Sequence, residues 1–305
     1  MLFLKPAMRV VLVLAVAGAG ILRAQVSTGL RPCSNHMKPE QQIAIGDKAA
    51  AQVYKQQPIL PDSSPVTQYV QRLGQRLAAY APGYQWPFNF HVVEVSDINA
   101  FALPGGSIFI NLGTIQAAED EAQLAAVMAH EISHVVLQHS VCNLEKQRQV
   151  GFWAGLGGIA ADLALGGGTL GGLAQETVGI GAGLGFLKMS RGDEKQADLE
   201  GAAILYNAGY DPRAMPQFFE TIEAKYGQGG AQFLSDHPNP GNRTGYVMAE
   251  IRRFPRRTHY VTNSPEFERI HQLVATMPAY SDKQVASGAW KKQSPSTTVS
   301  AGAAK

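Results

Sequence analysis

Hydrophobic positions recur with a helical period in three parts of the chain. Residues 40–57 and 64–80 carry apolar side chains three or four positions apart. The second of these segments begins with Ser64-Pro65, a helix cap followed by proline at the first helical position. The spacing continues from Glu119 to Glu145, where acidic residues occupy the first turn, as the helix dipole favours. We expect a helix in each segment.

Two shorter stretches have the apolar pattern of β-strands. They are residues 90–95 and residues 107–111, and the second follows the turn Leu103-Pro104-Gly105-Gly106. Helical spacing returns over residues 195–207, and Asp211-Pro212 predicts the start of another helix. The sequence therefore predicts an α+β fold that is predominantly α-helical, with a small β-sheet.

The first 24 residues have the three parts of a secretory signal peptide. Lys5 and Arg9 form a positive start, and an apolar run from Val10 to Leu22 precedes the small residue Ala24. This run is shorter than the roughly 20 residues that span a bilayer. An uncleaved N-terminal anchor is the alternative, and either interpretation predicts that the chain is exported.

Composition and charge exclude two broad classes. Hydrophobic residues make up 45% of the 305 residues and charged residues 16%, so the chain is not a disordered polyampholyte. The formal net charge is +2, and three of the basic residues lie within the first 24 positions. A near-neutral body offers no electrostatic footprint for nucleic acid, and we expect no such partner.

Export changes the interpretation of the two cysteines, Cys33 and Cys142. In an oxidising compartment they are candidates for a disulfide that ties the N-terminal segment to the core. Two unpaired cysteines, with Cys142 buried on a helix, are the alternative. The sequence leaves this choice open.

The rest of the chain suggests one large domain with additions. Residues 25–255 are expected to form it, residues 256–285 a C-terminal extension, and residues 286–305 a disordered tail rich in Ser, Ala, Lys and Thr. Within the domain, residues 151–187 are dominated by Gly, Ala and Leu. Closely packed helices, peripheral contact with a membrane or partner, and a membrane-embedded segment are the alternatives for this insertion.

The motif His130-Glu131-Ile132-Ser133-His134 lies within the third helical segment. Histidines at positions i and i+4 project from one helical face, so both imidazoles can reach a single Zn²⁺. Glu131 is rotated by about 100° from His130. It is placed beside the metal without being a ligand, where it can take a proton from a water bound there.

A third ligand must come from another segment. His139 would lie about 140° around a continuous helix from His134, so we expect it on the helix surface or behind a ligand. Glu194 is the better candidate, and its carboxylate would complete a two-His, one-Glu site. Asp198 follows one turn later and can accept the free N–H of a ligand histidine.

These motifs resemble those of a known family. The His-Glu-x-x-His motif, the segment from Glu194 to Asp198 and the segment Asn99–Gly106 together resemble zinc endopeptidases of the HtpX and CAAX-prenyl-protease (gluzincin) type. The nearest resemblance is to the soluble periplasmic, BepA-like branch, and it covers residues 40–255. The resemblance implies a zincin-like fold, a periplasmic location and one Zn²⁺ per chain. It assigns His130, His134 and Glu194 as ligands, Glu131 as catalytic base and Asp198 as a further catalytic acid.

The segment from Asn99 to Gly106 is a candidate for substrate binding. Gly105 and Gly106 permit a tight turn, after which residues 107–111 are expected to form an edge strand beside the active-site helix. An edge strand pairs with an extended peptide backbone with little side-chain selectivity. We expect Asn99, Ala100, Phe101, Gly105 and Gly106 to contribute to this site, and an ordinary hairpin is the alternative.

His237 is the last candidate catalytic residue. Pro238 follows it and favours an extended, loop-like backbone. A loop histidine near zinc would either stabilise the oxyanion of the transition state or occupy the open metal position and hold the enzyme latent. The resemblance includes an arginine after the His-Pro pair, which matches Arg243. That side chain is expected to orient a carboxylate of Asp198 or Glu194, and a surface charge without such a role is the alternative.

The chain is therefore expected to be an exported zinc endopeptidase. Its partners would be polypeptides, with unfolded or misassembled envelope and outer-membrane proteins as the expected substrates. An envelope chaperone or scaffold with a structural zinc site is the alternative function, and Glu131 argues against it because a structural site does not need a general base.

Overall fold

The computed structural model describes residues 25–149, 189–227, 233, 236–238 and 241–292. The expected signal peptide, the Gly-rich insertion 151–187 and the last part of the tail lie outside the described residues. The helices and strands, in chain order, are α1 (Pro39–Gln56), α2 (Pro65–Ala78), β1 (Asn89–Val93), β2 (Ala100–Ala102), β3 (Ser107–Asn111), α3 (Leu112–Ala117), α4 (Glu121–Val136), α5 (His139–Gln149), α8 (Arg191–Ala208), α9 (Ala214–Tyr226), α11 (Arg243–Ile251), α12 (Pro265–Thr276), α13 (Asp282–Ala286) and the short 3-10 helix Ala289–Lys292.

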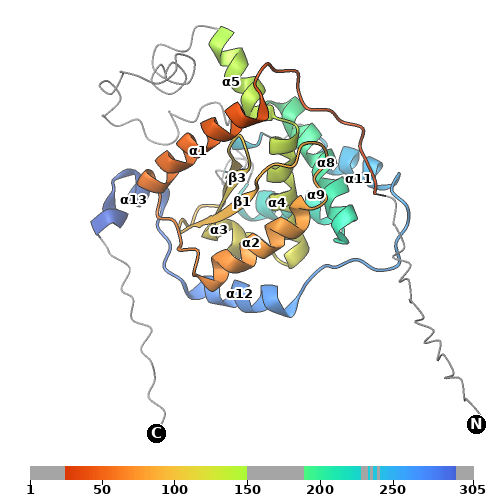
Figure 1. The fold of residues 1–305 in the computed structure, drawn as a ribbon. Helices are drawn as coiled ribbons and strands as arrows, with labels where there is room; N and C mark the ends of the chain where they lie inside the picture. Colours follow the sequence, from red (N-terminus) through yellow and green to blue (C-terminus); the bar gives the residue numbers. More distant parts are fainter. Residues whose placement is uncertain (1–24, 150–188, 228–232, 234–235, 239–240, 293–305) are drawn as a thin grey trace, which may run out of the picture.

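The structure is a mainly helical α+β fold with one small sheet, as the sequence predicts (Figure 1). The strand order is β1-β3-β2, with β1 parallel to β3 and β2 antiparallel to it. The expected strand at residues 107–111 is present, but β3 is the central strand, so its expected edge position is wrong. The continuous apolar run Ile108-Phe109-Ile110 is typical of a strand that is buried on both faces. The outer strand of the hairpin is β2.

Helices cover both faces of the sheet. Phe109 packs with Val53 of α1 on one face. Ile108 and Ile110 point to the other face, where they join the large core that α2 and α4 share. Side chains alternate between the two faces of a strand, so successive residues of β3 are buried against helices on opposite sides of the sheet.

Helix α4 runs through the middle of the molecule, and all of its 16 residues are buried. Its first turn is capped by Asp120, whose side chain accepts a hydrogen bond from the Gln123 backbone N–H at 2.9 Å. A helix that is buried all round needs neighbours on every side, and α2, α8, α9 and the sheet provide them (Figure 1). The active-site motif is therefore carried by the least exposed element of the fold.

The expected continuous helix from Glu119 to Glu145 is wrong, because the chain turns between α4 and α5. Gln138 adopts a left-handed backbone conformation with φ of 60°. Its side-chain Oε1 accepts hydrogen bonds from Asn35 at 2.5 Å and from Gln42 at 3.0 Å. The residues that make these contacts lie about 100 positions earlier in the chain. The local sequence contains no glycine or proline that would predict the turn.

An extended N-terminal segment, residues 25–38, crosses the surface from α8 to α5, and we call it the strap (Figure 1). Cys33 and Cys142 form a disulfide that ties the strap to α5. The Cys33 backbone N–H also donates to the Leu137 carbonyl at 3.0 Å. The disulfide alternative is therefore the correct one, and it fastens the strap beside the α4–α5 turn.

Helix α8 lies against α4 at close range. It begins at Arg191, one turn before the expected residue 195, because Ser190 and Asp193 form a reciprocal cap. Further along α8, a Cβ atom placed on Gly201 would lie 3.2 Å from the His130 backbone nitrogen. The absence of a side chain at this position lets the two helices that carry the site approach each other.

The next helix, α9, begins later than the sequence predicts. Asp211 does not cap it; the carboxylate accepts hydrogen bonds from the backbone N–H and the guanidinium of Arg213, at 2.9 Å each. The helix proper starts at Ala214. Asp211 therefore stabilises the turn that precedes α9.

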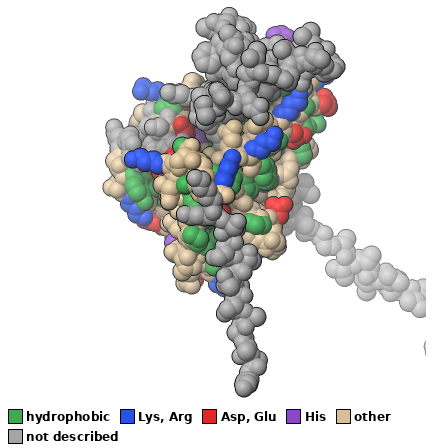
Figure 2. Space-filling model, turned by 90° about the vertical axis from the view of Figure 1, so that its left-hand side faces the viewer, with side chains coloured by type: hydrophobic (Ala, Val, Ile, Leu, Met, Phe, Trp, Pro, Cys, Tyr) green, Lys and Arg blue, Asp and Glu red, His purple; other side chains and the backbone are tan. Residues whose placement is uncertain are grey.

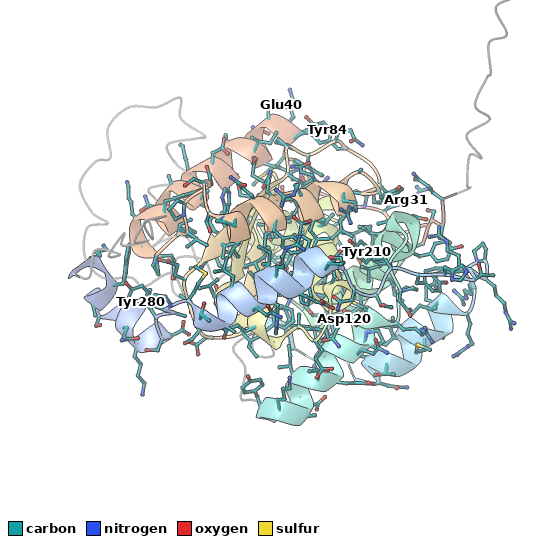
Figure 3. All side chains as sticks on the ribbon, turned by 90° about the horizontal axis from the view of Figure 1, so that it is seen from below. Arg31, Glu40, Tyr84, Asp120, Tyr210 and Tyr280 are labelled. Carbon is teal, nitrogen blue, oxygen red and sulfur yellow. A yellow bond between two sulfur atoms is a disulfide. The ribbon has the colours of Figure 1, made fainter. Side chains whose placement is uncertain are left out.

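The C-terminal region shares the core of the preceding helices. Phe267, Ile270 and Val274 of α12 are buried in the same cluster as α4. Figure 3 looks at α12 from below, with Tyr210 and Asp120 beside one of its ends. There the buried carboxylate of Glu121 accepts a hydrogen bond from Tyr210 at 2.5 Å.

The surface of the described residues is mixed in character. On the face shown in Figure 2, Lys and Arg side chains lie among acidic and hydrophobic ones. Among the described helices, none combines the length and the apolar character that a bilayer-spanning segment needs.

Candidate active site

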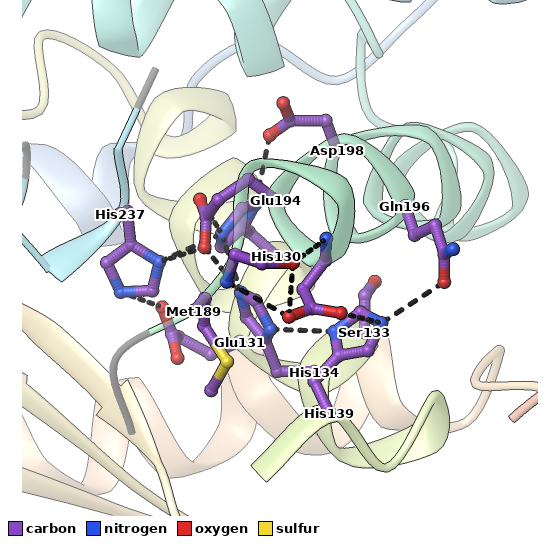
Figure 4. A network of polar contacts seen from close by, with 12 residues as sticks. His130, Glu131, Ser133, His134, His139, Met189, Glu194, Gln196, Asp198 and His237 are labelled. Atoms are coloured by element: carbon purple, nitrogen blue, oxygen red, sulfur yellow. Dashed lines mark hydrogen bonds and ion pairs between the residues drawn. The ribbon is translucent and has the colours of Figure 1, made fainter. Parts of the chain in front are cut away.

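His130 and His134 lie one turn apart on α4, and both rings are buried. Their Nε2 atoms face each other at 2.9 Å, as the i, i+4 spacing predicts (Figure 4). When both Nε2 atoms are unprotonated, as metal ligands must be, two lone pairs point at the same place. Such an arrangement is favourable when a cation lies between them.

Glu194 approaches the same point from the N-terminal part of α8. One carboxylate oxygen lies 3.3 Å from His130 Nε2, and the other lies 3.4 Å from His134 Nε2. The cap at Ser190 starts α8 at Arg191, so Glu194 lies in the first turn of the helix. The structure therefore brings together the three residues that the sequence proposes as ligands, although Glu194 is 60 positions after His134.

His237 is the fourth member of the cluster. Its Nδ1 lies 3.0 Å from a Glu194 oxygen and 3.3 Å from His130 Nε2. The ring stacks on Phe233, with 4.4 Å between the ring centroids. These contacts place a loop histidine inside the group formed by the two helices.

The spacing of these four side chains fits a tetrahedral metal site. One ligand atom from each of the four lies within 4.8 Å of the others. Ligands at 2.0–2.1 Å from a tetrahedral Zn²⁺ are separated by about 3.3 Å, which is close to the distances given above. Three imidazoles and one carboxylate also form a donor set that binds zinc in preference to magnesium or calcium.

The charges of the buried groups fit a divalent cation as well. Glu131, Glu194 and Asp198 are buried carboxylates, and Arg243 is the one buried guanidinium that lies among them in the described part of the chain. With neutral imidazoles the group carries two excess negative charges. Buried charges are costly unless they are paired, so a divalent cation would complete the balance.

Asp198 and Arg243 lie behind the ligands. Asp198 Oδ1 is 3.0 Å from His130 Nδ1, and neither atom has a hydrogen bond to any other described residue. Arg243 donates from Nε to Asp198 at 2.7 Å and from Nη2 to Glu194 at 3.0 Å. Its guanidinium also lies 3.6 Å above the ring of Phe219. Arg243 thus contacts both of the carboxylates that the sequence offers as its alternatives.

Tyr246 contacts the site without being predicted from the sequence. Its hydroxyl donates a hydrogen bond to Asp198 Oδ2, the same oxygen that Arg243 contacts. Burial and the neighbouring Asp198 charge raise the pKa of the Tyr246 hydroxyl, which therefore remains a donor. Tyr246 follows Arg243 by three residues, so both lie on one face of α11, and this i, i+3 spacing could have indicated Tyr246 only once Arg243 and Asp198 had been placed together.

His139 is buried beside the ligands instead of lying on a helix surface. Its Nδ1 is 2.9 Å from His134 Nδ1, and its Nε2 is 3.3 Å from Gln196 Oε1 (Figure 4). Of the two expected positions for His139, the surface position is wrong, and the ring lies behind the candidate ligand His134. The turn at Gln138 is the reason, because it breaks the helix that would have carried His139 away from His134.

Glu131 is buried next to the ligand cluster but outside it. One of its carboxylate oxygens lies 3.5 Å from His237 Nε2 and accepts no hydrogen bond from the described residues. Burial raises the pKa of the Glu131 carboxyl, against the opposing effect of His237 and His130. A carboxylate with an uncommitted oxygen beside a metal site is the arrangement that a general base requires.

The buried environment favours different charge states for the candidate ligands Glu194 and His134. Burial alone would raise the pKa of Glu194, but His237 and His130 hold it well below its usual range. Burial lowers the pKa of the His134 ring well below its ordinary value. Glu194 is therefore an anionic donor and His134 a neutral one. Against the effect of burial, Glu194 and Asp198 raise the pKa of His130 to about 10, so a metal ion at the site would displace a proton from that ring.

The segment from Asn99 to Gly106 lies partly inside the fold. Asn99 donates from its amide to Asp236 at 3.0 Å and so ties the start of β2 to the loop of His237. Ala100 is buried, and Phe101 stacks on Phe109. Gly105 and Gly106 both have positive φ angles, of 83° and 112°. The expected turn is present.

A match to a known family decides the identification. The model of peptidase family M48 matches residues 65–250, which is more than half of the chain. The chain belongs to peptidase family M48. The matched range contains all four members of the cluster, together with Glu131, whereas the strap, α1 and α12 lie outside the M48 match.

Several known proteases are similar to this chain. It is 34% identical over 209 residues to the beta-barrel assembly-enhancing protease of Yersinia pestis, which covers 67% of this chain and 42% of that protein. It is 33% identical over 187 residues to the mitochondrial metalloendopeptidase OMA1 of Schizosaccharomyces pombe, covering 61% of this chain and 53% of that protein. It is 27% identical to the metalloprotease LoiP of Escherichia coli, covering 67% and 77%. The chain thus spans less than half of the length of the beta-barrel assembly-enhancing protease.

Proposed function

We propose that this chain is a zinc-dependent endopeptidase. The convergence of four ligand atoms on one point, with Glu131 beside them and not among them, is the observation that carries the proposal. His130, His134 and Glu194 would hold the metal. Membership of a peptidase family and the names of its metalloendopeptidase relatives support the same reaction.

The proposed mechanism divides the work among the residues around the metal. A Zn²⁺ ion held by these residues would supply Lewis acidity at the scissile carbonyl and would make a neighbouring water more acidic. Glu131 takes the proton of the attacking water and passes it to the leaving amine. Asp198 holds the His130 ring through Nδ1 and lies behind it, so we assign it to positioning and not to proton transfer. Arg243 pairs with Asp198 and Glu194 and holds both carboxylates in place.

We propose that substrates bind as an added strand along β2. The Asn99 carbonyl accepts a hydrogen bond from the Asn111 backbone N–H, and the Leu103 N–H donates to the Ser107 carbonyl, so the backbone groups of Ala102 face away from β3. A peptide that pairs there must be extended, which favours unfolded chains. Together with the expected export signal, this supports unfolded or misassembled envelope proteins in the periplasm as substrates. A substrate contact by Asn99, Gly105 or Gly106 stays a prediction.

We further propose that the conformation seen here is latent. His237 Nδ1 lies among the ligand atoms, in the place where a catalytic zinc site keeps an open position for water. Of the two roles considered for His237, occupation of the metal position agrees better with this placement than oxyanion stabilisation. Activation would require the loop around His237 to move away from Glu194.

The substitution His237→Ala separates these two roles. If His237 blocks the metal, the variant should cleave an unfolded protein substrate several-fold faster than the unmodified chain. An oxyanion role predicts the opposite, a loss of roughly 10²–10³-fold. Initial cleavage rates, measured at equal zinc content, give the sign of the effect, and a decrease would overturn the proposed latency.

Metal removal tests the function itself. Treatment with a chelator should abolish cleavage of an unfolded protein, and added Zn²⁺ should restore it. Mg²⁺ and Ca²⁺ should fail to restore activity, because three nitrogen donors and one carboxylate suit zinc and not these hard cations. Undiminished cleavage by protein shown to contain no metal would exclude the proposed mechanism.

A further inference from the structure

The second nitrogen of His134 faces a chain of uncharged groups. His134 Nδ1 lies 2.9 Å from His139 Nδ1, and His139 Nε2 lies 3.3 Å from Gln196 Oε1. Both rings are buried, with 1% of each residue exposed. Asp193 is the nearest carboxylate to His139 Nε2, but at 4.0 Å it is too far for a hydrogen bond. The contact at the end of this chain is therefore an amide oxygen.

Only one placement of the protons satisfies all three groups. A ligand at His134 Nε2 needs its lone pair there, so the ring proton must be on Nδ1. That proton is donated to His139 Nδ1, which must then be an acceptor and carry its own proton on Nε2. The Nε2–H of His139 in turn donates to Gln196 Oε1.

We propose that His139 and Gln196 are positioning residues that fix the proton and the orientation of the metal ligand His134. This inference rests on the proposed zinc site. It gives each of the two ligand histidines its own support: a carboxylate for His130, through Asp198, and an uncharged pair for His134. Partners of this kind hold a ligand ring in its binding orientation and raise metal affinity.

The contact between His139 and His134 requires an unfavourable backbone conformation. His139 points back at His134 only because Gln138 is left-handed. Asn35 of the strap and Gln42 of α1 hold this conformation, and the disulfide from Cys33 lies beside it. A purely packing role for residue 139 would not need a buried polar ring that is satisfied at both nitrogens.

A pair of substitutions at position 139 tests the proposal. In His139→Asn, the amide oxygen can lie close to the position of Nδ1 and keep the acceptor. His139→Leu fills similar space without an acceptor. We expect Leu to weaken Zn²⁺ affinity by about 10- to 100-fold, and Asn to stay within a few-fold of the unmodified chain. The measurement is competition for Zn²⁺ against a chromophoric chelator, and the visible spectrum of the Co²⁺-loaded protein should shift for Leu only.

Position 196 provides an independent pair. Gln196→Glu keeps an acceptor, whereas Gln196→Leu removes it. Because Gln196 is exposed, water can replace its amide, and the expected loss for Leu is only a few-fold. Should His139→Leu fail to fold, as judged by circular dichroism, the Gln196 pair still tests the order of affinities.

The outcomes distinguish this inference from the proposed function. Equal Zn²⁺ affinity for His139→Leu, His139→Asn and the unmodified chain would overturn the positioning role while leaving the zinc site intact. Equal weakening by Leu and Asn in folded protein would also overturn it, since the acceptor would then be irrelevant. Failure of the unmodified chain to bind Zn²⁺ would instead reject the proposed function.

Discussion

Replacing Glu131 by Gln should lower the rate of cleavage of an unfolded protein by about 10²–10⁴-fold, the usual contribution of a general base. The amide has the shape of the carboxylate but does not accept a proton at neutral pH. Zinc content should stay the same, because Glu131 lies outside the ligand cluster. Cleavage rates measured alongside the metal content of each sample test both parts of the prediction.

The same variant addresses the alternative function. A chaperone or scaffold with a structural zinc site would not depend on Glu131. If the Glu131→Gln protein lost its hydrolysis and yet fully restored envelope integrity in cells that lack the normal chain, binding would be the essential activity. Full hydrolytic activity in the purified variant would refute the proposed mechanism directly.

Replacing Glu194 by Ala should have the largest effect on the metal site. Its carboxylate contacts His130, His134 and His237, and it pairs with the buried Arg243. Loss of a direct ligand should weaken Zn²⁺ binding beyond the roughly 100-fold that supporting residues contribute. Breaking a buried ion pair typically lowers the free energy of unfolding by about 3–5 kcal/mol. Zinc competition and urea unfolding without added metal measure the two effects separately.

Glu200 on the same helix is a matched control for Glu194. It is also a buried glutamate of α8, and it accepts a hydrogen bond from Thr28 of the strap, away from the ligand cluster. Glu200→Ala should therefore leave Zn²⁺ affinity unchanged, whatever its effect on stability. If Glu194→Ala kept full affinity, or if Glu200→Ala lost it to the same extent, Glu194 would not be a metal ligand.

The candidate ligand set could be proposed from the sequence because it depends mostly on local geometry. The His130–His134 pair needs only a helix, and the 3.6-residue period fixes where both rings point. Glu194 and Asp198 share a face of α8 for the same reason. Their meeting with the histidines depends on how α4 and α8 pack, and the sequence supplied that step through its resemblance to a known family.

Features that depend on distant contacts were mispredicted or missed. The turn at Gln138 is stabilised by Asn35 and Gln42, so the local sequence between α4 and α5 still has the pattern of a continuous helix. The central position of β3 depends on β1, which precedes it by 18 residues in register. Tyr246 was missed because a tyrosine near a helix start has no chemical signature until its neighbour Asp198 is known.

The cluster has a consequence for how long the molecule survives. His130 and His134 stay one turn apart in any local helix, whereas Glu194 and His237 join them only in the native fold. An ion held by all of them binds native molecules far more tightly than unfolded ones. At a free concentration a thousandfold above its dissociation constant, such an ion adds about 4 kcal/mol of stability. In surroundings starved of zinc, the protein would therefore lose its protection against unfolding together with its activity, and would itself become a target for degradation.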